Sequence, residues 1–262
     1  MDTQNQLPPP ALAGLTEIAP LTNPIIISDL HLAPTKPKTI MAFVRFMKTI
    51  APRYPELVIL GDLFDYWIGD DAHPEAQPVI ALLKLHAATG RRVIVMPGNR
   101  DVMLGAAFAR AAGAELIRDP IVADICGRKT LLAHGDQWCL GDVAYQKLRA
   151  LTHHPRSPAM KLMKSVEERL AIAKQARAQS ESEKGEKSMA DMDVVESAVA
   201  EAVKAAGVDL VIHGHTHQPA AHMQNGYERW VIPDWELDGP DGTAKSGAIT
   251  ILEDARPQIQ MF

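Results

Sequence analysis

The sequence lacks several features that would assign the protein to common functional classes. It has no uninterrupted apolar run of the roughly 20 residues that a membrane-spanning helix needs, and its first residues lack the basic start and apolar core of a signal peptide. It has only two cysteines, Cys126 and Cys139, whose spacing fits neither a disulfide framework nor a zinc ribbon. We therefore expect a protein of the reducing cytoplasm that does not cross the membrane.

An excess of positive charge is also missing. The formal net charge is −5, whereas a general nucleic-acid binder would be basic overall, so we expect no nucleic-acid partner. The chain of 262 residues is 47% hydrophobic. It can therefore bury a full core as one large domain or as one domain with an insertion.

Short aliphatic runs alternate with helical patterns along most of the chain. Residues 1–23 are rich in proline and show no periodicity, which predicts a flexible N-terminal extension. From residue 24 onward, β-branched runs such as PIIISD and ELVILGD predict strands that are buried on both faces. Because helical segments separate these strands, we expect a single α/β domain over residues 24–262.

The region from about residue 142 to residue 206 breaks this alternation. It has almost no strand signal and predicts two or three inserted helices. Between Tyr145 and Ser180 there are eight Lys and Arg residues but only two Glu, a surplus of +6 in an acidic chain. Such a surplus is typical of a solvated helical face. The alternative is a helical lid that faces an anionic substrate or an anionic membrane surface.

Side chains that can bind metals follow five of the aliphatic runs. The clusters are SDLH with Asp29 and His31, GDLFD with Asp62 and Asp65, GNRD with Asn99 and Asp101, HGD with His134 and Asp136, and HGHTH with His213, His215 and His217. Each cluster alone is a weak signal, because a single Asp-x-His is more often a polar turn. Ligands of α/β sheets bind at the carboxyl ends of strands, so all five clusters can converge on one site.

The side-chain types restrict the metal and the chemistry. Carboxylates, imidazoles and an amide oxygen without thiolates exclude a structural zinc site and suit Mn²⁺, Fe²⁺ or Zn²⁺. Seven candidate ligands are too many for one ion, but two ions about 3.5–4 Å apart and bridged by a carboxylate would share them well. Such metal pairs catalyse in-line displacement at phosphorus, so the pattern predicts a hydrolase of phosphate esters or anhydrides.

The ordered motifs SDLH, GDLFD, GNRD, HGD and HGHTH resemble those of the calcineurin-like metallophosphoesterase superfamily. The longer stretches LGDLFDYWIGDD, GNRDVMLG, HGDQWCLGDVAYQKLR and KSMADMDV are similar to the family of UDP-2,3-diacylglucosamine pyrophosphatases of lipid A biosynthesis. The resemblance covers residues 24–219 and weakens after them. It implies a four-layer αββα sandwich with a helical lid over about 142–206, and a site for two Mn²⁺ ions, with Fe²⁺ or Zn²⁺ as alternatives.

The resemblance also implies roles for individual residues. The first metal would be bound by Asp29, His31 and His217. The second metal would be bound by Asn99, His134 and His215, and Asp62 would bridge the two. His213 falls outside the matching motif and is expected to be structural. Catalysis would involve Asn99, Arg100 and His215, and the substrate would contact these three together with Asp142, Ser180, Lys184 and Lys187 of the lid.

Two positions depart from what the superfamily leads us to expect. Arg100 stands where many members carry a histidine that donates a proton. Arginine keeps its proton, but its planar fork can bind phosphate oxygens bidentately, which suits a leaving group that is itself a phosphate. The pyrophosphatase family has asparagine where this chain has Lys184, so that contact stays open.

The resemblance therefore implies a peripheral enzyme on the cytoplasmic face of the inner membrane. It would hydrolyse UDP-2,3-diacylglucosamine by water attack at the α-phosphorus, giving UMP and 2,3-diacylglucosamine 1-phosphate (lipid X). Two alternatives stay open. One is a generic phosphodiesterase or phosphatase of the superfamily that acts on a soluble nucleotide. The other is a non-catalytic scaffold with the same fold, which the full set of seven ligands disfavours.

Further residues are candidates for supporting roles. Asp70 and Asp71 in WIGDD would orient the metal-binding histidines or lie in a solvated turn. Large apolar residues would line an acyl groove or belong to the core, which is the more common role for their types. These residues are Trp67, Trp138, Met160 and Met163.

Overall fold

Two β-sheets form the centre of the protein. The computed structural model describes residues 18–154, 156–184, 193–239, 242 and 244–262. The first sheet, in the order β11-β10-β1-β2-β3-β4, contains β1 (Pro24–Ile27), β2 (Glu56–Leu60), β3 (Arg92–Met96), β4 (Glu115–Leu116), β10 (Gly247–Ile251) and β11 (Pro257–Met261). The second, in the order β5-β6-β7-β9-β8, contains β5 (Ile121–Ile125), β6 (Arg128–Ala133), β7 (Leu210–His213), β8 (Ala221–Gln224) and β9 (Tyr227–Val231).

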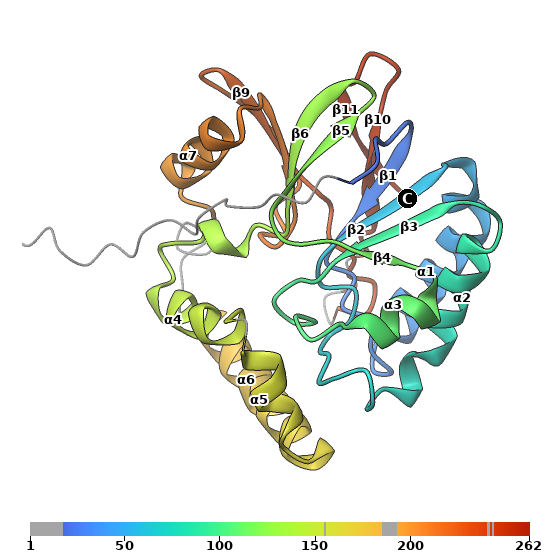
Figure 1. Cartoon of the computed structure of the whole chain (residues 1–262), viewed down its shortest axis with the longest axis vertical. Helices are drawn as coiled ribbons and strands as arrows, with labels where there is room; N and C mark the ends of the chain where they lie inside the picture. The colour runs from blue at the N-terminus through green and yellow to red at the C-terminus, as the bar shows by residue number, and fades with distance from the viewer. Residues whose placement is uncertain (1–17, 155, 185–192, 240–241, 243) are drawn as a thin grey trace, which may run out of the picture.

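Helices cover the outer faces of both sheets (Figure 1). The first sheet packs against α1 (Pro37–Thr49), α2 (Gln77–Ala87) and α3 (Ala106–Ala112), and the second against α7 (Glu196–Ala206). Successive residues of a strand point to opposite faces, so Ile25 packs toward the helices and Ile26 packs between the sheets. The predicted α/β fold and its four-layer αββα arrangement are confirmed.

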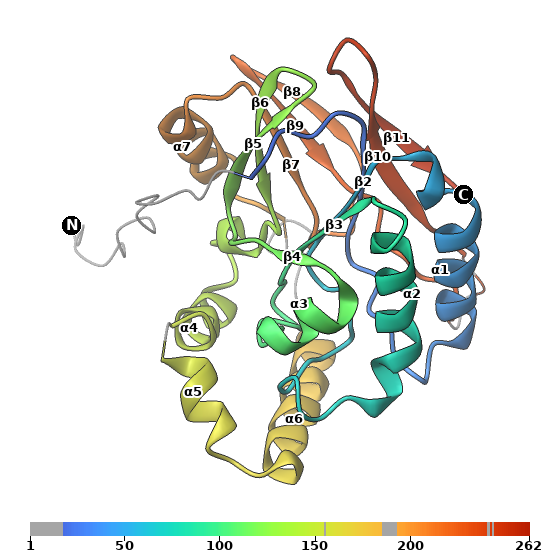
Figure 2. The same ribbon diagram turned by 45° about the vertical axis from the view of Figure 1, so that its right-hand side comes forward.

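The predicted helical region over residues 142–206 divides into two parts. Helices α4 (Val143–Thr152), α5 (Ser157–Leu162) and α6 (Val166–Lys184) extend away from the two sheets (Figures 1 and 2). Helix α7, by contrast, packs Val199 and Val203 against Leu131 and Val211 of the second sheet. The predicted lid was therefore too long at its C-terminal end. We keep the name lid for α4, α5 and α6.

Residues 18–23, which were predicted as part of the flexible N-terminal extension, are packed against the sandwich. Residues 1–17 lie outside the described residues. Leu21 is buried, its backbone N–H donates to Asp124 O at 2.8 Å, and its carbonyl accepts from Cys126 N at 2.9 Å. Ile18 is buried in the same apolar cluster between the sheets. These contacts attach residues 18–23 to β5 and place the start of the packed core before residue 24.

Among the described residues, no helix is both long enough and apolar enough to span a membrane.

Candidate metal centre

The seven predicted metal ligands follow strands of both sheets. Loops of the first sheet carry Asp29 and His31 after β1, Asp62 after β2 and Asn99 after β3. Loops of the second sheet carry His134 after β6, and His215 and His217 after β7. Strands β1, β2 and β3 are parallel to one another, as are β6 and β7. Their carboxyl ends therefore lie at common edges, and the loops that follow can converge.

Two groups of side chains in this region have the geometry to hold a metal ion. They are Asp29, His31 and His217, and Asp29, Asp62 and His134, and the ligand atoms of each group lie within 4.8 Å of one another. Asp62 Oδ2 lies 3.7 Å from His31 Nδ1, and Asp62 Oδ1 lies 3.7 Å from His134 Nε2. Asp62 thus contacts one histidine of each predicted metal group, as a bridging carboxylate would.

The other two predicted ligands lie beside His134. Asn99 Oδ1 is 2.9 Å from His134 Nε2, and the ring centroids of His134 and His215 are 5.0 Å apart. The backbone N–H of His215 donates to Asp29 Oδ2 at 2.9 Å. The structure therefore brings all seven predicted ligands to one place.

Several buried polar atoms at this place lack the partners that a folded protein normally provides. Among the described residues, neither His31 Nδ1 nor Asp29 Oδ1 makes a hydrogen bond. His31 Nε2 and His217 Nε2 lie 3.3 Å apart, so the lone pairs of both nitrogens can be directed at one ion. A cation accepts lone pairs from all these atoms, and oxygen and nitrogen donors without sulfur suit a divalent metal. The residues present fit such an ion.

The backbone of the site is strained. Five predicted ligands have positive φ angles, namely Asp29 (55°), His31 (48°), Asp62 (53°), His215 (68°) and His217 (56°). Such conformations are uncommon for residues other than glycine and cluster at functional sites, where the surrounding structure enforces them. Close backbone approach adds a constraint at Gly98, where a Cβ atom would collide with the carboxylate of Asp62.

The buried carboxylates raise the pKa of two of the histidines. Burial alone would lower the pKa of His134 and His217. The charges of Asp62 and Asp29 outweigh burial at His134, and Asp234 and Asp29 outweigh it at His217, so both pKa values are about 9. Without a bound cation, protons on these imidazoles therefore balance the carboxylates. A bound cation would replace the protons.

Comparison with known proteins agrees with this geometry. Residues 23–219 match the sequence model of the family described as calcineurin-like phosphoesterase. The chain belongs to this family.

Curated relatives of this phosphoesterase share most of its length. A protein named UDP-2,3-diacylglucosamine hydrolase from Bordetella pertussis is 43% identical over 82% of this chain and 86% of its own. Proteins of the same name from Chromobacterium violaceum (44%; 80% of this chain, 89% of its own) and Ralstonia nicotianae (42%; 87% and 90%) are similarly related. The resemblance inferred from the motifs is confirmed, and family and donor set together support a divalent metal at this centre.

One residue that supports the site of this phosphoesterase was not predicted from the sequence. Asp234 Oδ2 lies 3.2 Å from His217 Nδ1, and Asp234 Oδ1 lies 2.8 Å from Lys245 Nζ. A carboxylate on the second nitrogen of a metal-binding histidine fixes the orientation of its ring. The available signal was the position of Asp234 just after β9, which matches the position of the ligands after other strands.

Asp101 belongs to one of the five polar clusters, but its contacts show a different role. Its carboxylate accepts hydrogen bonds from the backbone N–H groups of Gly98 at 2.7 Å, Phe64 at 3.2 Å and Asp62 at 3.3 Å. Asp101 therefore connects the loops after β2 and β3.

The prediction that Asp70 and Asp71 orient metal-binding histidines is wrong. Asp70 accepts from Trp67 Nε1 and from backbone N–H groups at the start of α3, including that of Phe108 at 3.0 Å. Asp71 forms a bidentate ion pair with Arg169 of α6, at 2.8 and 2.6 Å. Both carboxylates satisfy partners of their own loop or of a helix, so neither is available to an imidazole of the site.

Arg100 lies at the edge of the predicted metal centre. Its backbone N–H donates to Asp62 Oδ1 at 2.9 Å, and its Nε lies 3.5 Å from Asp62 Oδ2. Its Nη1 lies 3.4 Å from Asp65 Oδ1. The guanidinium is therefore next to the predicted bridging ligand.

The predicted lid contacts are described to different extents. Asp142 caps α4, and its Oδ1 accepts from Tyr145 N at 3.0 Å. Ser180 and Lys184 lie on the last turns of α6, where the structure describes only the backbone. Lys187 lies outside the described residues. Their proposed contacts with the substrate stay predictions.

The other candidates divide between core and surface. His213 is buried, and its Nδ1 donates to Gly214 O at 2.9 Å, in keeping with a structural role. Trp67 and Trp138 are also buried in apolar clusters and therefore do not line an open acyl groove. Met160 and Met163 of the lid are exposed.

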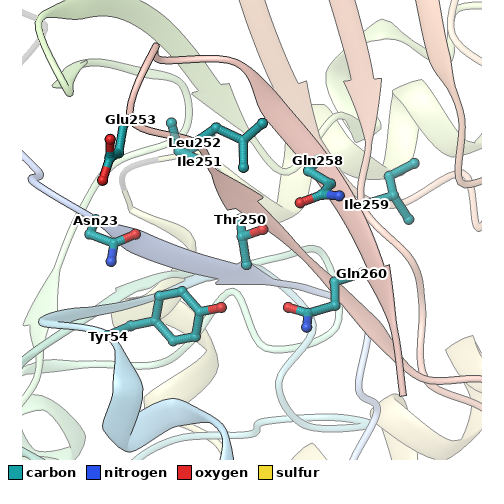
Figure 3. Close-up of a pocket in the computed structure, with 9 residues that line it drawn as sticks. All are labelled: Asn23, Tyr54, Thr250, Ile251, Leu252, Glu253, Gln258, Ile259 and Gln260. Atoms are coloured by element: carbon teal, nitrogen blue, oxygen red, sulfur yellow. The ribbon is translucent and has the colours of Figure 1, made fainter.

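A separate hollow of about 370 Å³ lies at the opposite end of β1 (Figure 3). Its lining includes Asn23, Tyr54, Thr250, Gln258 and Gln260. Asn23 precedes β1, whereas the metal centre follows this strand. None of the seven predicted ligands, all of which are described, lines this hollow.

Proposed function

We propose that this phosphoesterase hydrolyses the pyrophosphate bond of UDP-2,3-diacylglucosamine in lipid A biosynthesis. The products are UMP and 2,3-diacylglucosamine 1-phosphate. The observation that carries the proposal is sequence identity of 42–44% to hydrolases of that name over at least 80% of the chain. The convergence of seven oxygen and nitrogen ligands supports it, because an enzyme of this class requires a metal centre.

The centre binds two Mn²⁺ ions in this proposal. Asp29, His31 and His217 would hold one ion, Asn99, His134 and His215 would hold the other, and Asp62 would be shared between them. When bound, the two cations neutralise the phosphoryl oxygens and lower the pKa of a coordinated water, which supplies the nucleophile.

The residues around the metals position the pyrophosphate for attack at the α-phosphorus. Asn99 and His215 orient the phosphoryl group beside the metal ligand His134. Arg100 binds the second phosphate through its guanidinium and stabilises the negative charge that develops on it as it leaves. Because this leaving group is a stable anion, no acid is needed to protonate it, and arginine is a suitable residue here.

The lid contacts the acylated sugar phosphate of the substrate in this proposal. Asp142, Ser180, Lys184 and Lys187 bind its sugar and phosphate groups. Apolar side chains exposed on α4 and α5, such as Leu151 (71% exposed) and Met160 (66%), lie on the same helices as Lys147, Lys161 and other basic residues. This composition suits peripheral attachment to the anionic cytoplasmic face of the inner membrane.

Hydrolysis in ¹⁸O-labelled water tests the proposal. The purified protein with Mn²⁺ and UDP-2,3-diacylglucosamine should release UMP that carries the label, as detected by mass spectrometry. Label in the lipid phosphate would contradict attack at the α-phosphorus. An intact lipid substrate together with cleavage of soluble nucleotides would favour a generic phosphodiesterase, and the absence of any bindable metal would favour a scaffold.

A further inference from the structure

One carboxylate connects the lid to the residue proposed to bind the leaving phosphate. Asp65 Oδ1 lies 3.4 Å from Arg100 Nη1 and 3.1 Å from Arg177 Nη1 of α6. Arg100 in turn lies 3.5 Å from the predicted bridging ligand Asp62. A continuous series of charged contacts therefore runs from α6 through Asp65 and Arg100 to the metal centre.

The contact with Arg100 is shielded from water. The side chain of Asp65 is 14% exposed and that of Arg100 is 13% exposed. An ion pair in such surroundings is screened less than a surface pair, so it restrains the guanidinium more strongly. The position of the Asp65 carboxylate thus determines where the Arg100 fork points.

The backbone around Asp65 is itself fixed. Asp65 N donates to Leu32 O at 3.2 Å, in the loop that carries His31, and Trp67 N donates to Arg100 O at 3.0 Å. The segment is therefore attached to two loops of the metal centre. Asp65 is a stationary anchor, and the side chains that pair with it take their positions from it.

Arg177, the partner of Asp65 on the lid, lies on the face of α6 that also carries positions 180 and 184. Positions 180 and 184 follow Arg177 by three and seven residues, a spacing that places helical positions on one face. When Arg177 is held at Asp65, the rotation of α6 about its axis is set, and with it the face that carries these two positions. Arg169, about two turns earlier, pairs with Asp71 and fixes α6 at a second point.

We propose that Asp65 is a positioning residue that aligns Arg100 and lid helix α6 on one carboxylate. The guanidinium of Arg100 and the proposed substrate-binding face of α6 are then held at a fixed position relative to each other. This inference rests on the proposed function, because it takes Arg100 as a phosphate ligand.

A double-mutant cycle tests the proposal on the full chain loaded with Mn²⁺. Binding of inorganic phosphate is measured by calorimetry for the wild type and for Arg100→Lys, Asp65→Asn and the double variant. In the wild-type background, Arg100→Lys should weaken phosphate binding about tenfold, as expected for loss of a charge-assisted bidentate contact. In the Asp65→Asn background the same change should cost about twofold or less, because the fork is already misplaced.

Asp71→Asn is the matched control. It removes an ion pair of the same type from the same helix, but its carboxylate does not contact Arg100. Arg100→Lys should therefore keep its full effect of about tenfold in the Asp71→Asn background. Equal effects of Arg100→Lys in the Asp65→Asn and Asp71→Asn backgrounds would overturn the proposal.

Two further measurements keep the test decisive. If Asp65→Asn fails to fold, the cycle is run with Asp65→Glu, which displaces the carboxylate by one methylene group, and an equal effect of Arg100→Lys in the wild-type and Asp65→Glu backgrounds would overturn the proposal. Steady-state kinetics on UDP-2,3-diacylglucosamine should show kcat lowered about tenfold in Asp65→Asn and a change confined to KM in Asp71→Asn. The calorimetric cycle uses inorganic phosphate, so it can succeed even if the protein does not hydrolyse UDP-2,3-diacylglucosamine. Unchanged phosphate binding in Arg100→Lys would also overturn the inference.

Discussion

The sandwich and the lid are held in place by different forces. The sandwich is built on three clusters of buried apolar side chains, one between the sheets and one beneath each helical layer. No residue of α4, α5 or α6 belongs to these clusters, within the part of the chain that is described. Ion pairs attach the lid instead: Arg149 to Asp136, Arg169 to Asp71, and Arg177 to Asp65.

This difference separates the parts of the chain that carry the metal centre and the lid. Close packing of strands places the metal ligands reproducibly, because packed cores resist displacement. A lid held by ion pairs leaves its apolar side chains exposed, as Leu151 is, and therefore free for the proposed lipid partner. The metal centre therefore depends on the sandwich, and the proposed contact with the lipid depends on the lid.

The largest effect is expected from loss of the bridging carboxylate. Asp62→Asn should lower kcat about a thousandfold or more, because it weakens both metal sites and the charge stabilisation that they provide. The exposed pair Asp254 and Arg256 offers a matched control on the β10–β11 turn. Asp254→Asn should keep wild-type rates, and comparable losses in both variants would contradict the assignment.

Leucine-to-alanine substitutions should lower the free energy of unfolding much more in the sandwich than in the lid. Leu132→Ala, in the cluster between the sheets, should lower the free energy of unfolding by about 2–5 kcal/mol. Leu151→Ala, on the exposed surface of α4, should change it by about 0.5 kcal/mol or less. Denaturant unfolding monitored by circular dichroism measures both. Similar values would mean that the lid is as tightly packed as the sandwich.

Charge reversal on the lid should affect membrane attachment and leave the metal centre intact. Lys161→Glu combined with Lys164→Glu should weaken binding to anionic phospholipid vesicles by about tenfold or more. Sedimentation with vesicles of increasing anionic content gives the binding curve. Lys129→Glu, at an exposed position of β6 away from the lid, is the control, and an equal loss in this variant would show that the lid has no special role.

A smaller effect is expected from pH. As the pH rises, the stability of the metal-free protein should fall, whereas the stabilisation given by Mn²⁺ should grow. The folded-state pKa of about 9 for His134 and His217 lies above the ordinary value of 6.5. In metal-free protein this stabilisation is fully present below about pH 6.5 and is lost as the pH rises toward 9. Metal binding requires the neutral imidazole, so the increase in Tm given by Mn²⁺ should grow over the same range. Melting curves at pH 6 and pH 9, with chelator or with Mn²⁺, measure this increase, and a constant increase would contradict it.

Much of the sandwich could be predicted because its central strands are continuous apolar runs. The runs that form β1, β2, β3 and β7 are buried on both faces, and each leads directly into metal ligands. The hairpin of β8 and β9 was missed, because both strands are short, no residue of β8 is buried, and only alternate residues of β9 are buried. The dipeptide Asn225–Gly226, with φ of 90° at the glycine, was the local signal for its turn.

The relation between lid and sandwich could not be predicted in the same way. Helix α7 has the same local signals as the lid helices, and only its packing on the second sheet distinguishes it. The pairs that hold α6 join residues about a hundred positions apart, as Asp71 and Arg169 do. No local pattern encodes such a pair. Asp234 was missed because β9 was missed.

The most direct test of the paired metal centre is the stoichiometry and magnetic coupling of bound Mn²⁺. Metal analysis together with electron paramagnetic resonance should show two Mn²⁺ per chain in the wild type, with the spectrum of an exchange-coupled pair. This coupled signal should be absent from Asp62→Asn. A single uncoupled ion in the wild type, or a coupled pair that persists without Asp62, would contradict the account.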